Sequence, residues 1–115
     1  MITVEHQGNL TIVGVFGEMV LADYRLFEQE VLQQLQMLGR VKLLIDLRTM
    51  LGYTLDVAFE DVKFTRDHAV AVGRIAILSQ REWVKWMALL SQLFINSDVR
   101  VFDNETAARD WLAET

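Results

Sequence analysis

The stretch Val41–Leu47 (VKLLIDL) constrains the fold most, because five of its seven residues are apolar. A short run of this kind is typical of a strand that is covered on both faces, as strands of a parallel sheet are. Arg74–Leu78 (RIAIL) has the same character. Parallel strands need crossover connections, which are usually helices, so the chain is expected to alternate between strands and helices.

The first forty residues predict a hairpin followed by a helix. Ile2–Glu5 and Leu10–Gly17 read as strands on either side of the turn signal Gly8-Asn9. A helix is expected over Leu21–Leu38, and Gly39 suits the left-handed position that ends it. Its core face is formed by residues at spacings of three and four, namely Tyr24, Phe27, Val31, Leu35 and Leu38.

After the central strand, Arg48–Tyr53 is expected to be a loop, and Thr54 to cap a helix over Leu55–His68. Further helices are predicted for Glu82–Phe94 and, after a strand at Val99–Phe102, for the C-terminal segment. That last helix is capped by Asp103 or Asn104, and its core face comprises Ala107, Ala108, Trp111 and Leu112.

The predicted order is therefore β-β-α-β-α-β-α-β-α. It describes a single α/β domain over residues 1–115, with a mixed, largely parallel five-stranded sheet and four helices on more than one side of it.

Composition excludes several classes of function. The chain has no cysteine, which removes disulfides, thiol catalysis and cysteine-ligated zinc. Its net charge of −5 argues against a nucleic-acid partner, because phosphates are bound by a surplus of Lys and Arg. Neither a signal peptide nor an apolar stretch long enough to span a bilayer is visible, so a cytoplasmic location is expected.

Four segments carry a family resemblance that spans nearly the whole chain: VKLLIDL at Val41–Leu47, EDVKFTRDHAVAVGRIAIL at Glu60–Leu78, REWVKW at Arg81–Trp86 and VRVFDNETAARDWL at Val99–Leu112. Together they resemble the SpoIIAA-like family, which is related to the STAS domains of sulphate transporters and anti-sigma-factor antagonists. The resemblance implies a STAS-type fold. It also brings an association with CRAL-TRIO-type lipid-transfer domains, but no defined activity.

The resemblance also points to a regulatory contact loop at Asp46, Arg48 and Thr54. True antagonists carry a phosphorylatable serine in an Asp-Ser-Ser-Gly motif at the start of the second helix. Here that region reads Thr54, Leu55, Asp56, Val57, without serine. Thr54 is the nearby hydroxyl, and a helix cap explains it without phosphorylation.

The segment Trp83–Phe94 gathers two tryptophans, a methionine and several leucines on one helical arc. It either packs on the sheet or leaves part of the arc for a ligand, a partner or a membrane surface. On the preceding helix, Val57 and Phe64 lie opposite the core face, so they meet this segment, are exposed, or form a homodimer interface. The sequence thus predicts an apolar ligand pocket lined by Phe64, Trp83, Trp86 and Met87.

No catalytic, metal or cofactor site is predicted. Neither His6 nor His68 is close in sequence to a convincing nucleophile, and the carboxylates of Asp56, Glu60 and Asp61 are followed by Lys63 and Arg66, as on a solvated face. The leading hypothesis is a non-enzymatic module that binds a small hydrophobic or lipid-like molecule, with transient membrane association. The alternative is a protein–protein regulatory domain that uses the segment after Asp46.

Overall fold

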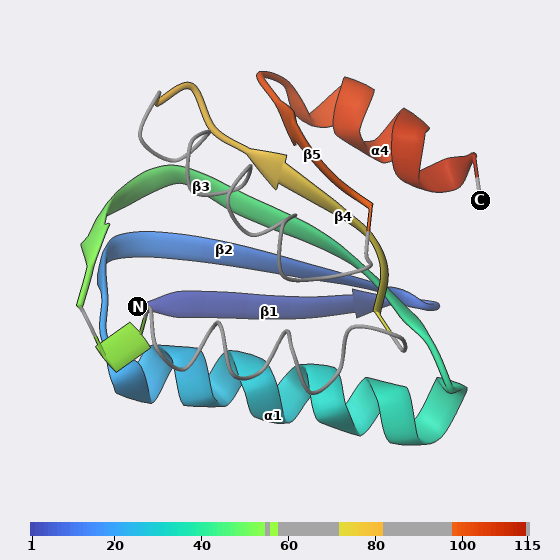
Figure 1. Ribbon diagram of the computed structural model, residues 1–115, viewed down its shortest axis with the longest axis horizontal. Helices are drawn as coiled ribbons and strands as arrows, with labels where there is room; N and C mark the ends of the chain where they lie inside the picture. Colours follow the sequence, from blue (N-terminus) through green and yellow to red (C-terminus); the bar gives the residue numbers. More distant parts are fainter. Residues whose placement is uncertain (55, 58–71, 82–97, 115) are drawn as a thin grey trace.

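The computed structural model describes residues 1–54, 56–57, 72–81 and 98–114, shown as coloured ribbon in Figure 1. The two helices predicted for Leu55–His68 and Glu82–Phe94 lie outside these residues, apart from Asp56 and Val57. The described elements are β1 (Ile2–Gln7), β2 (Leu10–Met19), α1 (Leu21–Leu38), β3 (Val41–Tyr53), β4 (Val72–Leu78), β5 (Val99–Phe102) and α4 (Glu105–Ala113).

The five strands form one sheet in the order β1-β2-β3-β4-β5. β1 and β2 are antiparallel, in the hairpin expected from Gly8-Asn9, and each later pair of neighbours is parallel. The predicted mixed, largely parallel five-stranded sheet is therefore confirmed.

The segment Arg48–Tyr53, predicted as a loop, is instead the second half of β3, so that prediction was wrong. The strand continues because β2 also runs on, to Met19, and pairs with it from Phe16↔Thr49 to Met19↔Tyr53. Two register shifts, between Gly14 and Phe16 and between Gly17 and Glu18, accommodate the irregular sequence. Gly17 takes a positive φ of 67°, which residues other than glycine rarely adopt.

The sheet has a core on each face, because alternate residues of β3 point in opposite directions. Val41 and Leu43 face the core that α1 covers, while Leu44 faces the core that α4 covers. Figure 1 shows α1 running along β1 and α4 lying beside β5. The apolar run that predicted a doubly covered strand is explained by these two layers.

α1 has the predicted bounds. At its start, Oδ2 of Asp23 accepts a hydrogen bond from the Val20 N–H at 3.2 Å. At its end, Gly39 has a φ of 80° and donates its N–H to the Leu35 carbonyl at 2.9 Å. Tyr24, Phe27 and Val31 are buried, and Leu35 packs against them. Leu38 is 48% exposed, because it ends the last turn beside Gly39 instead of continuing the buried stripe.

α4 is capped by Asn104, whose Oδ1 accepts from the Ala107 N–H at 2.8 Å. Basic side chains hold its C-terminal turn: Lys42 donates to the Leu112 carbonyl and Arg74 to the Trp111 carbonyl, each at 2.7 Å. Cations suit this end of a helix, where unpaired carbonyls carry partial negative charge. In the described part of the chain, neither helix is long and apolar enough to cross a membrane.

Candidate functional site

The site suggested by Asp46 lies at the carboxyl end of the parallel strands. Asp46 is in register with Leu78, the last residue of β4, and Leu78 with Phe102, the last residue of β5. Of the described parallel strands, β2 and β3 continue beyond this level. We call the continuing segments, Phe16–Met19 and Leu47–Tyr53, the β2–β3 tip. Such ends of α/β sheets are where ligands and partners commonly bind.

Asp46 and Arg48 are brought together at the base of this tip. A register shift between β2 and β3 falls here, since Asp46 pairs with Gly14 and Thr49 with Phe16. Arg48 donates to Asp46 through its side chain at 2.9 and 2.8 Å and through its backbone N–H at 3.0 Å. The Arg48 side-chain hydrogen bonds hold the pKa of Asp46 below its usual 3.8, against the opposing effect of partial burial. Asp46 is thus an ionised partner of Arg48.

Arg48 also reaches the start of α4, where its Nη2 lies 3.9 Å from Oε1 of Glu105. Glu105 in turn accepts from Arg109 at 3.0 Å, one turn further along α4. The positive charge of Arg48 is therefore balanced within the chain by two carboxylates. It is not an open anion-binding group.

Ser79 and Arg81 also belong to the site, although neither was predicted there from the sequence. Ser79 is fully buried, donates its backbone N–H to the Phe102 carbonyl at 3.1 Å, and accepts at Oγ from the Arg81 N–H at 3.1 Å. The Arg81 guanidinium donates to the carbonyl of Met50 on the β2–β3 tip. The sequence signal for this link was the polar residues that follow the apolar strand β4. Ser79 comes directly after Leu78, and Arg81 two residues later.

Thr54, the third predicted contact residue, follows the end of β3. Its backbone N–H donates to the Met19 carbonyl at 3.2 Å, and its hydroxyl donates to Oδ1 of Asp56. The same carboxylate oxygen accepts the Val57 N–H at 3.0 Å. The hydroxyl is therefore engaged in a local turn, several residues along β3 from Asp46 and Arg48.

Of the predicted apolar pocket, Phe64, Trp83, Trp86 and Met87 all lie outside the described residues. Val57, which the sequence analysis paired with Phe64 as a surplus apolar group, is 3% exposed and belongs to the core under α1. Exposure of Val57, and with it a part for its side chain in a homodimer interface, is therefore wrong. The helical pattern placed Val57 opposite the core face of its helix, but Val57 is buried there too.

A second constellation was missed because its members are far apart in sequence. His6 Nδ1 lies 3.0 Å from the hydroxyl of Thr11, and His6 Nε2 lies 2.8 Å from Oε2 of Glu30. The hydroxyl, the imidazole and the carboxylate are linked by hydrogen bonds in the same order as in the catalytic triad of a hydrolase. The Thr11 side chain is fully buried, however, so a substrate has no access to its oxygen in this conformation. The arrangement connects β1, β2 and α1.

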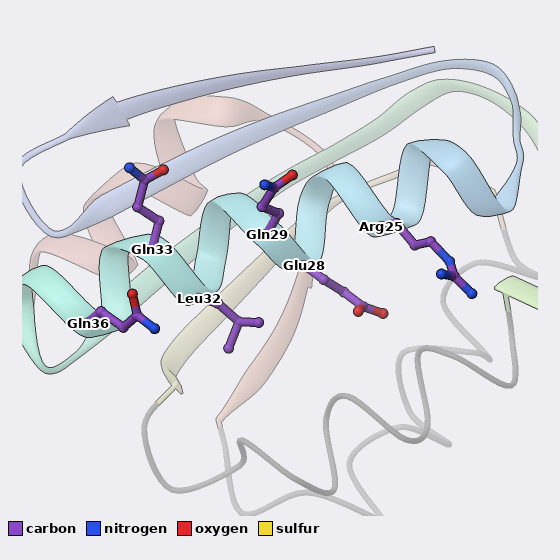
Figure 2. A pocket seen from close by; sticks show the side chains of 6 residues that line it. All are labelled: Arg25, Glu28, Gln29, Leu32, Gln33 and Gln36. Carbon is purple, nitrogen blue, oxygen red and sulfur yellow. The ribbon is translucent and has the colours of Figure 1, made fainter.

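An open hollow also runs along α1, lined by Arg25, Glu28, Gln29, Leu32, Gln33 and Gln36. Figure 2 shows the side chains of Arg25, Glu28, Leu32 and Gln36 on one side of the helix and those of Gln29 and Gln33 on another. The described lining comes from a single helix and gathers no catalytic set. Likewise, no group of three or more His, Asp or Glu side chains is placed to hold a metal ion within the described ranges.

Comparison with solved structures places this arrangement in a known fold. The chain superposes on an uncharacterized protein of the DUF3478 family with a SpoIIAA-like fold, from Shewanella loihica PV-4, with a TM-score of 0.80. The two are 23% identical, and the match covers 97% of this chain and 92% of that one.

Two further structures are anti-sigma factor antagonists. The unphosphorylated form of SpoIIAA matches with a TM-score of 0.70 and 8% identity, over 100% of both chains. An antagonist from Mycobacterium paratuberculosis matches with a TM-score of 0.60 and 15% identity, over 98% of this chain and 95% of that one. These identities show a common fold and nothing finer.

Among curated protein sequences, no match was found. A family model described as SpoIIAA-like matches residues 10–113, which include every strand from β2 to β5 and both described helices. The resemblance drawn from the four sequence segments is thereby confirmed, and the chain belongs to the SpoIIAA-like family.

Proposed function

We propose that this chain is a protein-binding regulatory module that contacts its partner through the β2–β3 tip and the Asp46–Arg48 pair at its base. The observation that carries the proposal is Leu51, a large apolar side chain that is 72% exposed at a register shift of β3, between the paired residues Met50 and Gly52. Phe16, on the neighbouring strand of the tip, is 42% exposed. Apolar side chains form the core of protein–protein interfaces, so these two residues are candidates for the contact.

The fold neighbours support this function class. SpoIIAA and the Mycobacterium paratuberculosis protein are both described as anti-sigma factor antagonists, a description that denotes action on another protein. The inward pairing of Asp46 and Arg48 suits such a role, since it stiffens the base of the tip without forming a reaction centre.

The proposed module works without phosphorylation of Thr54. SpoIIAA has been solved in unphosphorylated and phosphorylated forms. In this chain the Thr54 hydroxyl donates to Asp56, so a phosphoryl group there faces a like charge at close range. Binding of a small hydrophobic molecule through Phe64, Trp83, Trp86 and Met87 stays a prediction from the sequence.

Affinity capture tests the proposal. The tagged protein is incubated with a lysate of the organism that encodes it, and bound proteins are quantified by mass spectrometry for wild type, Leu51→Asp and Met37→Asp. Met37 is 69% exposed on α1, so Met37→Asp is a matched control for an apolar-to-acidic change at a comparably exposed site. We expect proteins retained by wild type and Met37→Asp to be lost with Leu51→Asp.

Two results would overturn the proposal. One is a set of bound proteins that is identical for all three variants. The other is binding to phosphatidylcholine–phosphatidylglycerol vesicles in a flotation assay with no protein retained, which favours the lipid hypothesis instead.

A further inference from the structure

Leu51 lies at a register shift between β2 and β3. The preceding residue, Met50, is 3% exposed and packs in the core under α1. The register shift between Gly17 and Glu18 leaves Leu51 as the extra residue of a β-bulge, without a partner on β2, and its side chain is 72% exposed. The backbone around it is held by pairing of Met50 with Gly17 and Gly52 with Glu18. Leu51, which we call the anchor, is therefore held between two paired residues.

The cations near this anchor are already engaged within the chain. Arg48 is bound to Asp46 and lies close to Glu105, and Arg81 donates to the Met50 carbonyl. Glu18, in contrast, is exposed and sits in register with Gly52, next to Leu51. In the described part of the chain no cation lies within ion-pair distance of Glu18. The surface around the anchor thus offers carboxylate charge.

From this charge pattern we infer that the partner bound at the β2–β3 tip is a protein whose surface carries Lys or Arg around an apolar pocket that receives Leu51. The inference rests on the proposed function and adds the chemistry of the partner. Glu18 pairs with a basic side chain at the rim of the pocket. The net charge of −5 of the whole chain attracts a basic surface from a distance and speeds association.

Site-specific photo-crosslinking tests the inference. Leu51→p-benzoylphenylalanine in the full chain is irradiated in cells of the encoding organism, and crosslinked peptides are sequenced. Met37→p-benzoylphenylalanine is the matched control on α1. We expect crosslinks from position 51 to peptides of another protein with Lys or Arg close to the linked residue, and none to that protein from position 37. Linked peptides without basic residues, or from a second copy of this chain, overturn the inference.

An affinity measurement on the crosslinked partner, purified without the crosslink, gives a second readout. We expect Glu18→Lys to weaken binding about tenfold, because it places like charges together, and added salt to weaken wild-type binding. Asp110→Lys, the same charge change on an exposed face of α4, is expected to leave affinity unchanged. Equal effects of the two variants overturn the inference but leave the proposed function standing. The absence of any protein crosslink from either position overturns both.

Discussion

Arg48 forms a two-point ion pair with Asp46, donating from Nε to Oδ1 at 2.9 Å and from Nη2 to Oδ2 at 2.8 Å. Both residues belong to β3. Asp46 lies at the level where β4 and β5 end, and Arg48 follows two residues later. The pair therefore closes the carboxyl end of the sheet on the side of α4, and it can be tested through pH.

We expect Asp46→Asn to remove part of the stability of the protein at neutral pH but not at low pH. The pKa of Asp46 is lower in the folded protein than its usual 3.8, so its contribution is present above that value and is lost as the pH falls through the folded-state pKa. The side chains of Asp46 and Arg48 are 29% and 40% exposed. Solvent screening therefore limits the loss in free energy of unfolding to about 0.5–1 kcal/mol.

Urea denaturation at pH 7 and at a strongly acidic pH measures this. Asp110→Asn, on an exposed part of α4, serves as the control. A difference between wild type and Asp46→Asn that is as large at the acidic pH as at pH 7 contradicts the ion-pair explanation.

Asn104→Ala is expected to destabilise the protein by about 1 kcal/mol, whereas Asn104→Asp keeps most of the stability. The Asn104 side chain accepts from the Ala107 N–H at 2.8 Å, and alanine offers no acceptor for that group. Urea denaturation of the two variants checks this. Equal losses for alanine and aspartate show that the cap does not contribute through its hydrogen bond.

Trp111 packs α4 against the sheet, so substituting it tests how much that packing stabilises the protein. It is 5% exposed, and the guanidinium carbons of Arg74 and Arg100 lie 4.7 and 5.2 Å from its ring. Trp111→Ala is expected to cost about 3–5 kcal/mol, through lost burial and the cavity left behind. Arg100→Met, which removes one cation–π contact, is expected to cost about 0.5–1 kcal/mol. Thermal unfolding followed by circular dichroism compares them. Nearly equal losses would falsify the view that burial dominates.

The parts of the fold that were predictable are those set by neighbouring residues. The period of α1 and its Gly39 terminator gave both ends of that helix, and the apolar run of Val41–Leu47 gave a doubly covered strand. The second half of β3 was missed, because Thr49, Gly52 and their neighbours form a strand only through pairing with β2, some thirty residues earlier. Asp46 and Arg48 were both assigned to the contact loop, but their ion pair was not predicted, because Arg48 was placed in a loop and not on the strand that carries Asp46.

The His6 cluster, in contrast, depends on tertiary structure, and it gives the last prediction. A carboxylate can only accept, so Glu30 requires that His6 carry its proton on Nε2, and Nδ1 of the neutral ring then accepts from the Thr11 hydroxyl. Heteronuclear NMR of the imidazole nitrogens is expected to show the Nε2–H tautomer for the neutral ring. Glu30→Ala is expected to mix the two neutral forms, because its removal leaves Thr11, which can donate or accept, as the remaining partner. Thr11→Val is expected to keep the Nε2–H form and to cost about 1 kcal/mol, through loss of the buried hydroxyl and its hydrogen bond. A neutral wild-type ring that carries its proton on Nδ1 contradicts the arrangement.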